Sequence, residues 1–155
     1  MEPSSTEPRK RRPSGPAVRH RFEVETMIRF GHCDPAGIVF YPRYLELFNA
    51  AVEDWVTNGL GISYAGLVGE RRVGMGPVGF QIDFDMPSRM GDMVHFGVSV
   101  EHLGNASLRL LLGCRCGDEQ RVRMTQTIVC TDITTARSQP FPADLRQAIE
   151  NYIKN

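Results

Sequence analysis

The spacing of apolar residues changes once along the chain, and this change constrains the fold most. Between Pro42 and Asn58 the apolar residues fill one half of a helical wheel, which predicts a helix of about four to five turns. After a glycine-rich connection over 59–79, apolar and polar residues alternate instead, as in strands that bury one face. The alternation continues through four runs, at 80–86, 94–100, 108–114 and 122–130.

A similar alternation precedes the helix, over 22–30, and predicts a first strand. Turn signals separate the later runs, namely Gly91-Asp92, Gly104-Asn105 and Gly117-Asp118. Short turns of this kind join antiparallel neighbours. A last amphipathic stretch over 143–152 is expected to cap the domain. We therefore predict an α+β fold in which a five-stranded antiparallel sheet wraps around one long central helix.

The first 18 residues differ in composition from the rest of the chain. They combine four prolines with several serines and the basic run Arg9-Lys10-Arg11-Arg12, and they offer almost nothing to bury. We predict a disordered tail over 1–18 and one folded domain over 19–155. The basic run is interpreted as part of a solvated extension rather than as a nucleic-acid or localisation patch.

The charge balance bears on possible partners. The formal net charge is zero, but the residues after Arg21 carry twelve basic and sixteen acidic side chains. A mildly acidic domain has no electrostatic footprint for nucleic acid or for an anionic membrane, so neither is an expected partner.

The cysteines and the apolar runs bear on location. There are four cysteines, Cys33, Cys114, Cys116 and Cys130. Their spacing lacks the two-residue gap of a zinc knuckle and suggests no disulfide framework, so no metal site is predicted. No run of eighteen apolar residues and no apolar leader segment occur. Reduced thiols and a cytoplasmic location are the resulting expectations.

The segment from Arg29 to Tyr44 interrupts both periodic patterns, and such interruptions often mark functional sites. Within it, Asp34 precedes Pro35, which favours an extended or turn backbone for the aspartate. Asp34 has two interpretations, either as a turn or cap residue or as a catalytic carboxylate. In the second, backbone N–H groups at the start of the helix would hold an oxyanion while the carboxylate attacks or activates water.

This segment resembles the signature of the 4-hydroxybenzoyl-CoA thioesterase family of the hotdog superfamily. The matching residues are Asp34-Pro35-Ala36-Gly37-Ile38-Val39 and then Tyr41-Pro42. The resemblance implies a hotdog fold and an acyl-CoA or aryl-CoA thioesterase that releases a free acid and coenzyme A. It makes Asp34 the nucleophile or general base, and the backbone N–H of Tyr41 the donor to the thioester carbonyl. It also implies a homodimer assembled into a homotetramer, and no cofactor, because coenzyme A is part of the substrate.

The resemblance further suggests residues that bind the substrate. His32 stands where the best-known member of the family has an acidic residue, and it is a candidate second acid–base group. Asn49 stands where the hydroxybenzoyl-specific enzyme has an acidic residue facing the substrate phenol, which weakens the case for a phenolic substrate. Phe40 suits an aryl or medium-length acyl chain. Candidates for binding the coenzyme A phosphates are Arg89 and Arg109, with Arg115, Arg121 and Arg123 as further ones.

Two alternative functions remain open. The thioester could be carried by acyl carrier protein, although an acidic carrier would favour a basic rim that the sequence does not show. The chain could also be a non-catalytic acyl-CoA-binding module with a hotdog shell. The complete loop around Asp34 argues against this second alternative, because a pure binder gains little from a carboxylate aimed at a thioester.

Overall fold

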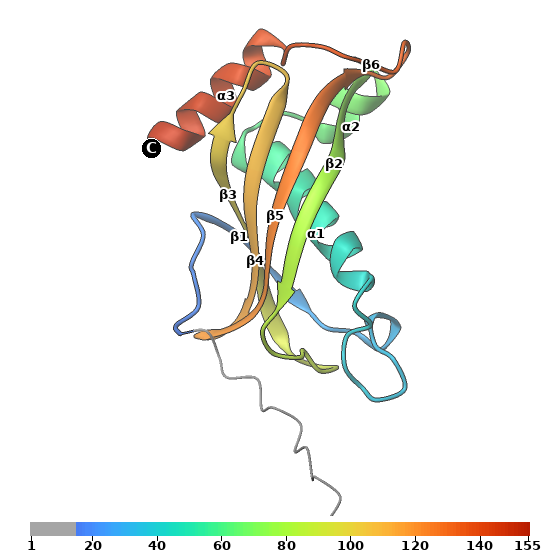
Figure 1. Cartoon of the computed structure of the whole chain (residues 1–155), viewed down its shortest axis with the longest axis vertical. Coiled ribbons are helices and arrows are strands. Elements are labelled where there is room, and N and C mark those ends of the chain that lie inside the picture. The colour runs from blue at the N-terminus through green and yellow to red at the C-terminus, as the bar shows by residue number, and fades with distance from the viewer. Residues whose placement is uncertain (1–14) are drawn as a thin grey trace, which may run out of the picture.

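One long helix lies against a curled antiparallel sheet in the computed structural model, which describes residues 15–155 (Figure 1). The strands are β1 Phe22–Met27, β2 Val73–Phe84, β3 Met93–Leu103, β4 Ser107–Cys116, β5 Glu119–Asp132 and β6 Arg137–Ser138. The helices are α1 Arg43–Asp54, α2 Tyr64–Gly69 and α3 Ala143–Lys154. Two short helical turns add to these, a 3₁₀ turn η1 over Phe30–His32 and a π turn η2 over Trp55–Gly59 that continues α1.

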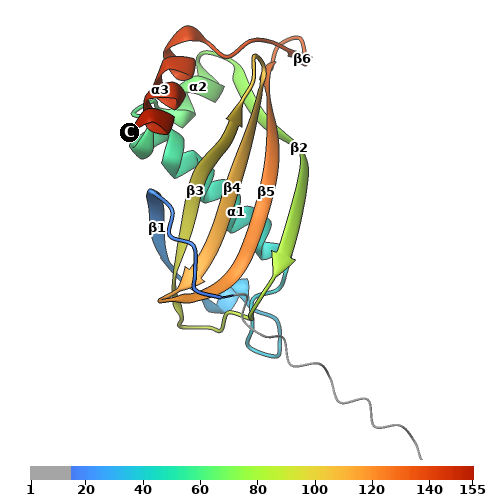
Figure 2. The ribbon, with the colours of Figure 1, turned by 60° about the vertical axis from the view of Figure 1, so that its left-hand side comes forward.

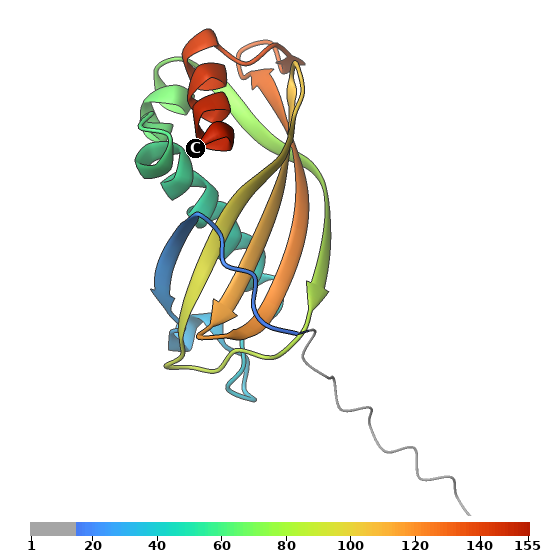
Figure 3. The same cartoon turned by 90° about the vertical axis from the view of Figure 1, so that its left-hand side faces the viewer.

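The sheet has the order β1-β3-β4-β5-β2, and all of these neighbours pair antiparallel. The views in Figures 2 and 3 show it curling so that α1 occupies its concave side. β1 and β2 are the ends of this order, and the short β6 pairs with β5. The predicted α+β class, with five antiparallel strands around a central helix, is thereby confirmed.

The core lies between α1 and the concave face of the sheet. The Phe48 ring of α1 meets the Phe96 ring of β3 edge-on, with centroids 5.1 Å apart. At the end of α1 the fully buried Trp55 meets Tyr152 of α3, with centroids 5.4 Å apart. The Tyr152 hydroxyl in turn donates a hydrogen bond to the Val98 carbonyl, which ties α3 to β3 as the predicted cap. The helix is thus packed against the sheet at its middle and against α3 at its C-terminal end.

Two stretches differ from the prediction. The first strand ends at Met27, because the chain turns into η1 and leaves Phe30 on the surface, 83% exposed. The connection over 59–79 is not irregular, since it contains α2 and the first half of β2. Ser63 caps α2 by accepting a hydrogen bond from the Gly66 N–H, and the glycines of β2 hide its strand alternation. The structure also adds the two-residue β6, which no sequence pattern indicated.

The N-terminal segment contacts the sheet from Pro16 onward. Residues 15–18 differ from the expected tail, because Pro16 pairs with Glu119 and the N–H of Val18 donates to Oε1 of Gln120, 2.9 Å away. These contacts place the segment on the convex face of the sheet, where the β4–β5 hairpin supplies its partners. Residues 1–14 of the predicted tail lie outside the described residues.

Two of the four free thiols belong to the core. Cys114 and Cys130 are buried, and burial raises the pKa of both thiols, so both remain protonated. Among residues 15–155, no helix is both long enough and apolar enough to cross a membrane.

Candidate active site

The chain between β1 and α1 forms a compact loop that is fixed at its base by His32. The Arg29 N–H donates a hydrogen bond to Nδ1 of His32 at 2.9 Å, which closes the η1 turn and leaves the ring proton on Nε2. The carbonyl of His32 accepts a hydrogen bond from the Phe40 N–H, also at 2.9 Å. His32 therefore joins the entry of the loop to its exit. Its candidate role as an acid–base group remains a prediction.

Asp34 lies in a tight reversal within this loop. Its N–H donates to the Ile38 carbonyl, and its own carbonyl accepts from the Gly37 N–H, both at 2.9 Å. Gly37 has a φ of 77°, which a glycine adopts without strain. The side-chain Oδ1 of Asp34 accepts a hydrogen bond from the Ala36 N–H at 2.8 Å. One carboxylate oxygen thus has the turn role, while no donor within residues 15–155 reaches Oδ2.

Tyr41 ends the loop and begins the turn into α1. Its carbonyl accepts a hydrogen bond from the Tyr44 N–H at 3.2 Å, but its own N–H has no acceptor among residues 15–155. Pro42, the next residue, has no N–H. A backbone donor left unpaired at a helix start can hold a developing negative charge.

A cavity of about 500 Å³ lies beside Tyr41. Its lining is almost entirely apolar or aromatic and consists of Ile38, Val39, Tyr41, Tyr44, Phe84, Met86 and Pro87. The Phe84 ring stands edge-on to the Tyr41 ring at 6.4 Å and lies 5.9 Å from the Tyr44 ring. These aromatic walls suit a flat apolar group.

Apart from Tyr41, the residues that wall this cavity were not predicted as site residues. Tyr44 was assigned only to the buried face of the helix, although it lies one helical turn beyond Tyr41. Burial raises the pKa of Tyr44 to about 12, although Ser88 partly opposes this rise. Its hydroxyl is buried and has no hydrogen-bond partner within residues 15–155.

The other predicted substrate contacts are distributed over several places. Phe40 is half exposed, and its ring lies 5.4 Å from the Tyr41 ring, but it does not line the cavity beside Tyr41. Asn49 belongs to a second hollow, of about 320 Å³, between α1 and β2. The remaining lining of that hollow is Leu45, Glu46, Pro77, Phe80 and Gln126.

The two predicted phosphate ligands differ in position. Arg89 pairs through its backbone with Ile38, so the fold brings it to the loop. Arg109 lies on β4 opposite Thr127 of β5, in the half of the sheet away from the loop, and its Nε is 3.4 Å from the Glu101 carboxylate. Only Arg89 of this pair is near the candidate catalytic residues.

Two further strand arginines are engaged in ion pairs. Arg115 forms two hydrogen bonds to the Glu23 carboxylate, and Arg123 forms two to the Asp85 carboxylate. A guanidinium held by two bonds has less capacity for a phosphate.

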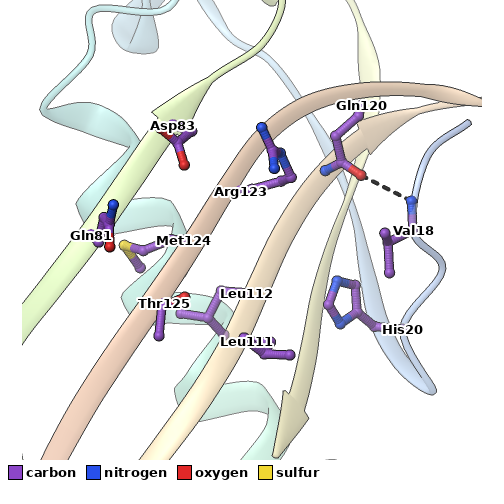
Figure 4. Close-up of a pocket in the computed structure, with 10 residues that line it drawn as sticks. All are labelled: Val18, His20, Gln81, Asp83, Leu111, Leu112, Gln120, Arg123, Met124 and Thr125. Atoms are coloured by element: carbon purple, nitrogen blue, oxygen red, sulfur yellow. Dashed lines mark hydrogen bonds between the residues drawn. The ribbon is translucent and has the colours of Figure 1, made fainter. Parts of the chain in front are cut away.

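A third hollow, of about 290 Å³, opens on the convex face of the sheet (Figure 4). Val18 and His20 of the N-terminal segment form one side of it, and Gln81 and Asp83 of β2 form another. No residue of the Asp34–Tyr41 loop lines it, which separates it from the candidate catalytic residues.

Comparisons with known proteins bear on the fold and on the family. The model of the thioesterase-like superfamily matches residues 28–149. A 1,4-dihydroxy-2-naphthoyl-CoA hydrolase of Synechococcus elongatus is 27% identical over 131 residues, which are 83% of this chain and 95% of the relative. The structure of a gentisyl-coenzyme A thioesterase superposes with a TM-score of 0.75 at 24% identity, over 81% of this chain and 99% of the other. A thioesterase from Thermus thermophilus, complexed with coenzyme A and Zn, superposes with a TM-score of 0.73 at 24% identity, over 86% and 94%. The chain therefore belongs to the thioesterase-like superfamily of thioester hydrolases, and it has their hotdog fold.

Proposed function

We propose that this protein hydrolyses the coenzyme A thioester of an aromatic or similarly apolar acid. The observation that carries the proposal is the unpaired N–H of Tyr41 at the edge of a cavity with aromatic walls. An acyl group in this cavity would bring its carbonyl oxygen close to that donor. The names of two similar proteins, a 1,4-dihydroxy-2-naphthoyl-CoA hydrolase and a gentisyl-coenzyme A thioesterase, also denote aromatic thioesters.

In the proposed mechanism Asp34 acts through its unpaired oxygen. Its carboxylate either attacks the thioester carbon or removes a proton from the attacking water. The carbonyl oxygen becomes negative in either case, and the Tyr41 N–H stabilises it by a hydrogen bond. Collapse of this intermediate breaks the C–S bond and releases coenzyme A as its thiolate. In the direct route, water then hydrolyses the anhydride formed with Asp34.

Arg89 is the residue we propose for contact with the coenzyme A phosphates. Its backbone pairs with Ile38 beside the loop, and its side chain is exposed. Its guanidinium has no hydrogen-bond or ion-pair partner among residues 15–155, and it could bind a phosphate bidentately. Arg109 is a weaker candidate, because it lies in the other half of the sheet and faces Glu101.

The edge strand β2 supports a homodimer as the functional unit. β2 is twelve residues long, ends the sheet order, and exposes Val78 and Phe80 by 67% and 53%. A long apolar edge strand offers unpaired backbone groups to a second copy of the chain. The cavity beside Tyr41 and the hollow that contains Asn49 both border β2 residues, so a partner there would complete their walls. We propose a dimer through β2, with further pairing into a tetramer, and light scattering would measure the mass.

The proposed function is tested by thiol release from a panel of benzoyl-, hydroxybenzoyl-, phenylacetyl- and linear acyl-CoA thioesters. We expect the wild type to prefer aromatic acyl groups. Asp34→Asn is the matched variant, because its amide oxygen can still accept the Ala36 N–H while the charge is lost. A wild type that is inactive on every coenzyme A ester would refute the proposal. Equal activity of Asp34→Asn would remove Asp34 from the mechanism.

A further inference from the structure

Arg121 of β5 is a largely enclosed arginine that does not line the cavity. Its side chain is 12% exposed, whereas that of Arg123 on the same strand is 49% exposed. Its Nη1 donates hydrogen bonds to the Pro87 carbonyl at 3.0 Å and to the Ser88 hydroxyl at 3.2 Å. A third bond from Nη1 reaches Oδ2 of Asp92 at 2.8 Å. One guanidinium nitrogen therefore holds three points of the connection between β2 and β3, over residues 85–92.

Asp92, at the β3 end of the connection over residues 85–92, joins Arg121 to the Arg89 backbone. Its Oδ2 also accepts the Arg89 N–H, at 2.9 Å. Burial would raise the pKa of Asp92, but the hydrogen bonds from Arg89 and Arg121 outweigh burial and lower it. The carboxylate thus stays ionised beside Arg121, while Glu119 balances the guanidinium on its other side, 2.6 Å from Nε.

The anchored connection lies directly against the loop that carries Asp34 and Tyr41. The Val39 N–H donates to the Ser88 carbonyl at 2.9 Å, and the Met90 N–H donates to the Gly37 carbonyl at 3.2 Å. Val39 is two residues before Tyr41, and it is buried. The position of Ser88 therefore restrains the backbone that presents the Tyr41 N–H.

The same connection forms part of the cavity wall, because Met86 and Pro87 both line it. The Pro87 carbonyl is held by Arg121, so the wall and the Tyr41 donor depend on one side chain. The backbone carbonyl of Arg121 also accepts the N–H groups of Asp85 and Met86, at 2.8 and 3.2 Å. Those backbone bonds keep the start of the connection in place even when the side chain is changed.

We infer that Arg121 is a positioning residue, which sets the geometry of the Tyr41 donor and the cavity wall through Pro87, Ser88 and Asp92. This role rests on the proposed thioesterase function. It replaces the interpretation of Arg121 as a phosphate ligand, because its guanidinium is engaged within the fold. The oxyanion donor must meet the reacting oxygen closely, so a small shift of the loop lowers the rate of the chemical step more than binding.

The test compares Arg121→Met and Arg121→Lys with a matched control, Arg71→Gln. Arg71 also forms a two-bond ion pair, with Asp144 at 2.7 Å for both bonds, but it precedes β2 at the end of the sheet away from the loop. We expect Arg121→Met to lower kcat by about tenfold to a hundredfold with little change in KM, as for a misplaced catalytic group. Arg121→Lys, which keeps the charge and can reach Asp92, should recover part of kcat. Arg71→Gln should keep the wild-type kcat.

A second measurement reads the positions directly and needs no substrate. Amide hydrogen exchange at Val39 and Met90 should become faster in Arg121→Met and stay unchanged in Arg71→Gln. The inference is overturned if Arg121→Met exchanges like the wild type, or if it keeps kcat while the wild type is active. It is also overturned if Arg71→Gln loses as much kcat. An inactive wild type would refute the proposed function alone, because the exchange data still test the positioning role. If Arg121→Met does not fold, Arg121→Lys replaces it in the exchange measurement.

Discussion

Two irregular stretches pack against the sheet, and they differ in whether their polar groups are hydrogen-bonded within the fold. In the N-terminal segment, residues 16–20, the Val18 N–H pairs with Gln120 (Figure 4). The ring of His20 pairs with the Ser99 hydroxyl. In the Asp34–Tyr41 loop, the Tyr41 N–H and Oδ2 of Asp34 have no partner among residues 15–155. Both groups lie on a partly exposed loop, where they are open to solvent or to a ligand instead of being paired within the fold. The difference suggests that the loop serves chemistry and the N-terminal segment serves stability.

The largest expected effect comes from removing the charge in the loop. Asp34→Asn should lower kcat/KM by about 10²–10⁴-fold, the usual contribution of a general acid or base. The Ala36 N–H can still bind the amide oxygen, so the free energy of unfolding should change by less than about 0.5 kcal/mol. Thiol-release kinetics and urea denaturation measure the two quantities on the same preparation.

Asp34→Ala sharpens this test, because it removes the charge and the turn acceptor together. We expect the same loss of activity and an additional loss of stability of about 0.5–1.5 kcal/mol, the value of one hydrogen bond. If Asp34→Asn keeps the wild-type activity while Asp34→Ala loses stability, the side chain serves the turn alone and the contrast between the two stretches fails.

A substitution beneath the N-terminal segment should lower stability and leave activity unchanged, the opposite of Asp34→Asn. A Cβ atom added at Gly97 would lie 2.5 Å from Cδ2 of His20 and 2.6 Å from its Cβ, so the segment would have to move. We expect Gly97→Ala to lower the free energy of unfolding by about 1–3 kcal/mol, as overpacking does. Activity per folded molecule should stay near that of the wild type. Thermal unfolding together with thiol-release kinetics would check both expectations.

Gly69→Ala is the control for this substitution, because an added Cβ there has no atom within 4 Å and Gly69 does not have a positive φ. It should keep stability or raise it by up to about 1 kcal/mol, because alanine is favoured over glycine in a helix. Loss of activity in Gly97→Ala without loss of stability would contradict the assignment of the N-terminal segment to stability.

The sequence predicts the regular elements of this fold because their periods report burial on one face. The stretch over 42–58 and the four alternating runs were found for that reason. The short α2 and the first half of β2 were missed, since a six-residue helix and a strand interrupted by glycines show no clear period. Their structure depends on the Ser63 cap and on pairing with β5.

The residues of the candidate site were likewise predictable from the sequence only in part. Asp34 and Tyr41 stand in one contiguous motif, so a resemblance could assign roles to both, and those roles remain predictions. Phe84 and Pro87 reach the cavity only because β2 ends beside the loop, which no local pattern states. Arg121 was considered only as a phosphate ligand, because strand alternation does not show that the connection over 85–92 folds onto it.

The smallest expected effect concerns the pH dependence of the N-terminal segment. Burial lowers the pKa of His20 below 6.5, while Glu23 raises it and Arg115 lowers it further. As the pH falls below about 6.5, the unfolded chain gains a proton that the folded chain resists, so the free energy of unfolding should fall. The slope due to this residue cannot exceed about 1.4 kcal/mol per pH unit.

Urea denaturation of the wild type and of His20→Gln from about pH 7.5 to 5.5 measures this slope, because only the wild type has the titrating group at this position. The pKa of Glu23 is lowered by its hydrogen bond from Arg115, and that pair is present in both proteins, as is His95 beside Glu25. The difference in the free energy of unfolding between the two proteins therefore reports on His20. If His20→Gln is the less stable protein at about pH 7.5, this difference should shrink as the pH falls. Parallel curves would show that the N-terminal segment does not depend on a neutral imidazole, and that its hydrogen bonds to Gln120 and Asp118 suffice to hold it on the sheet.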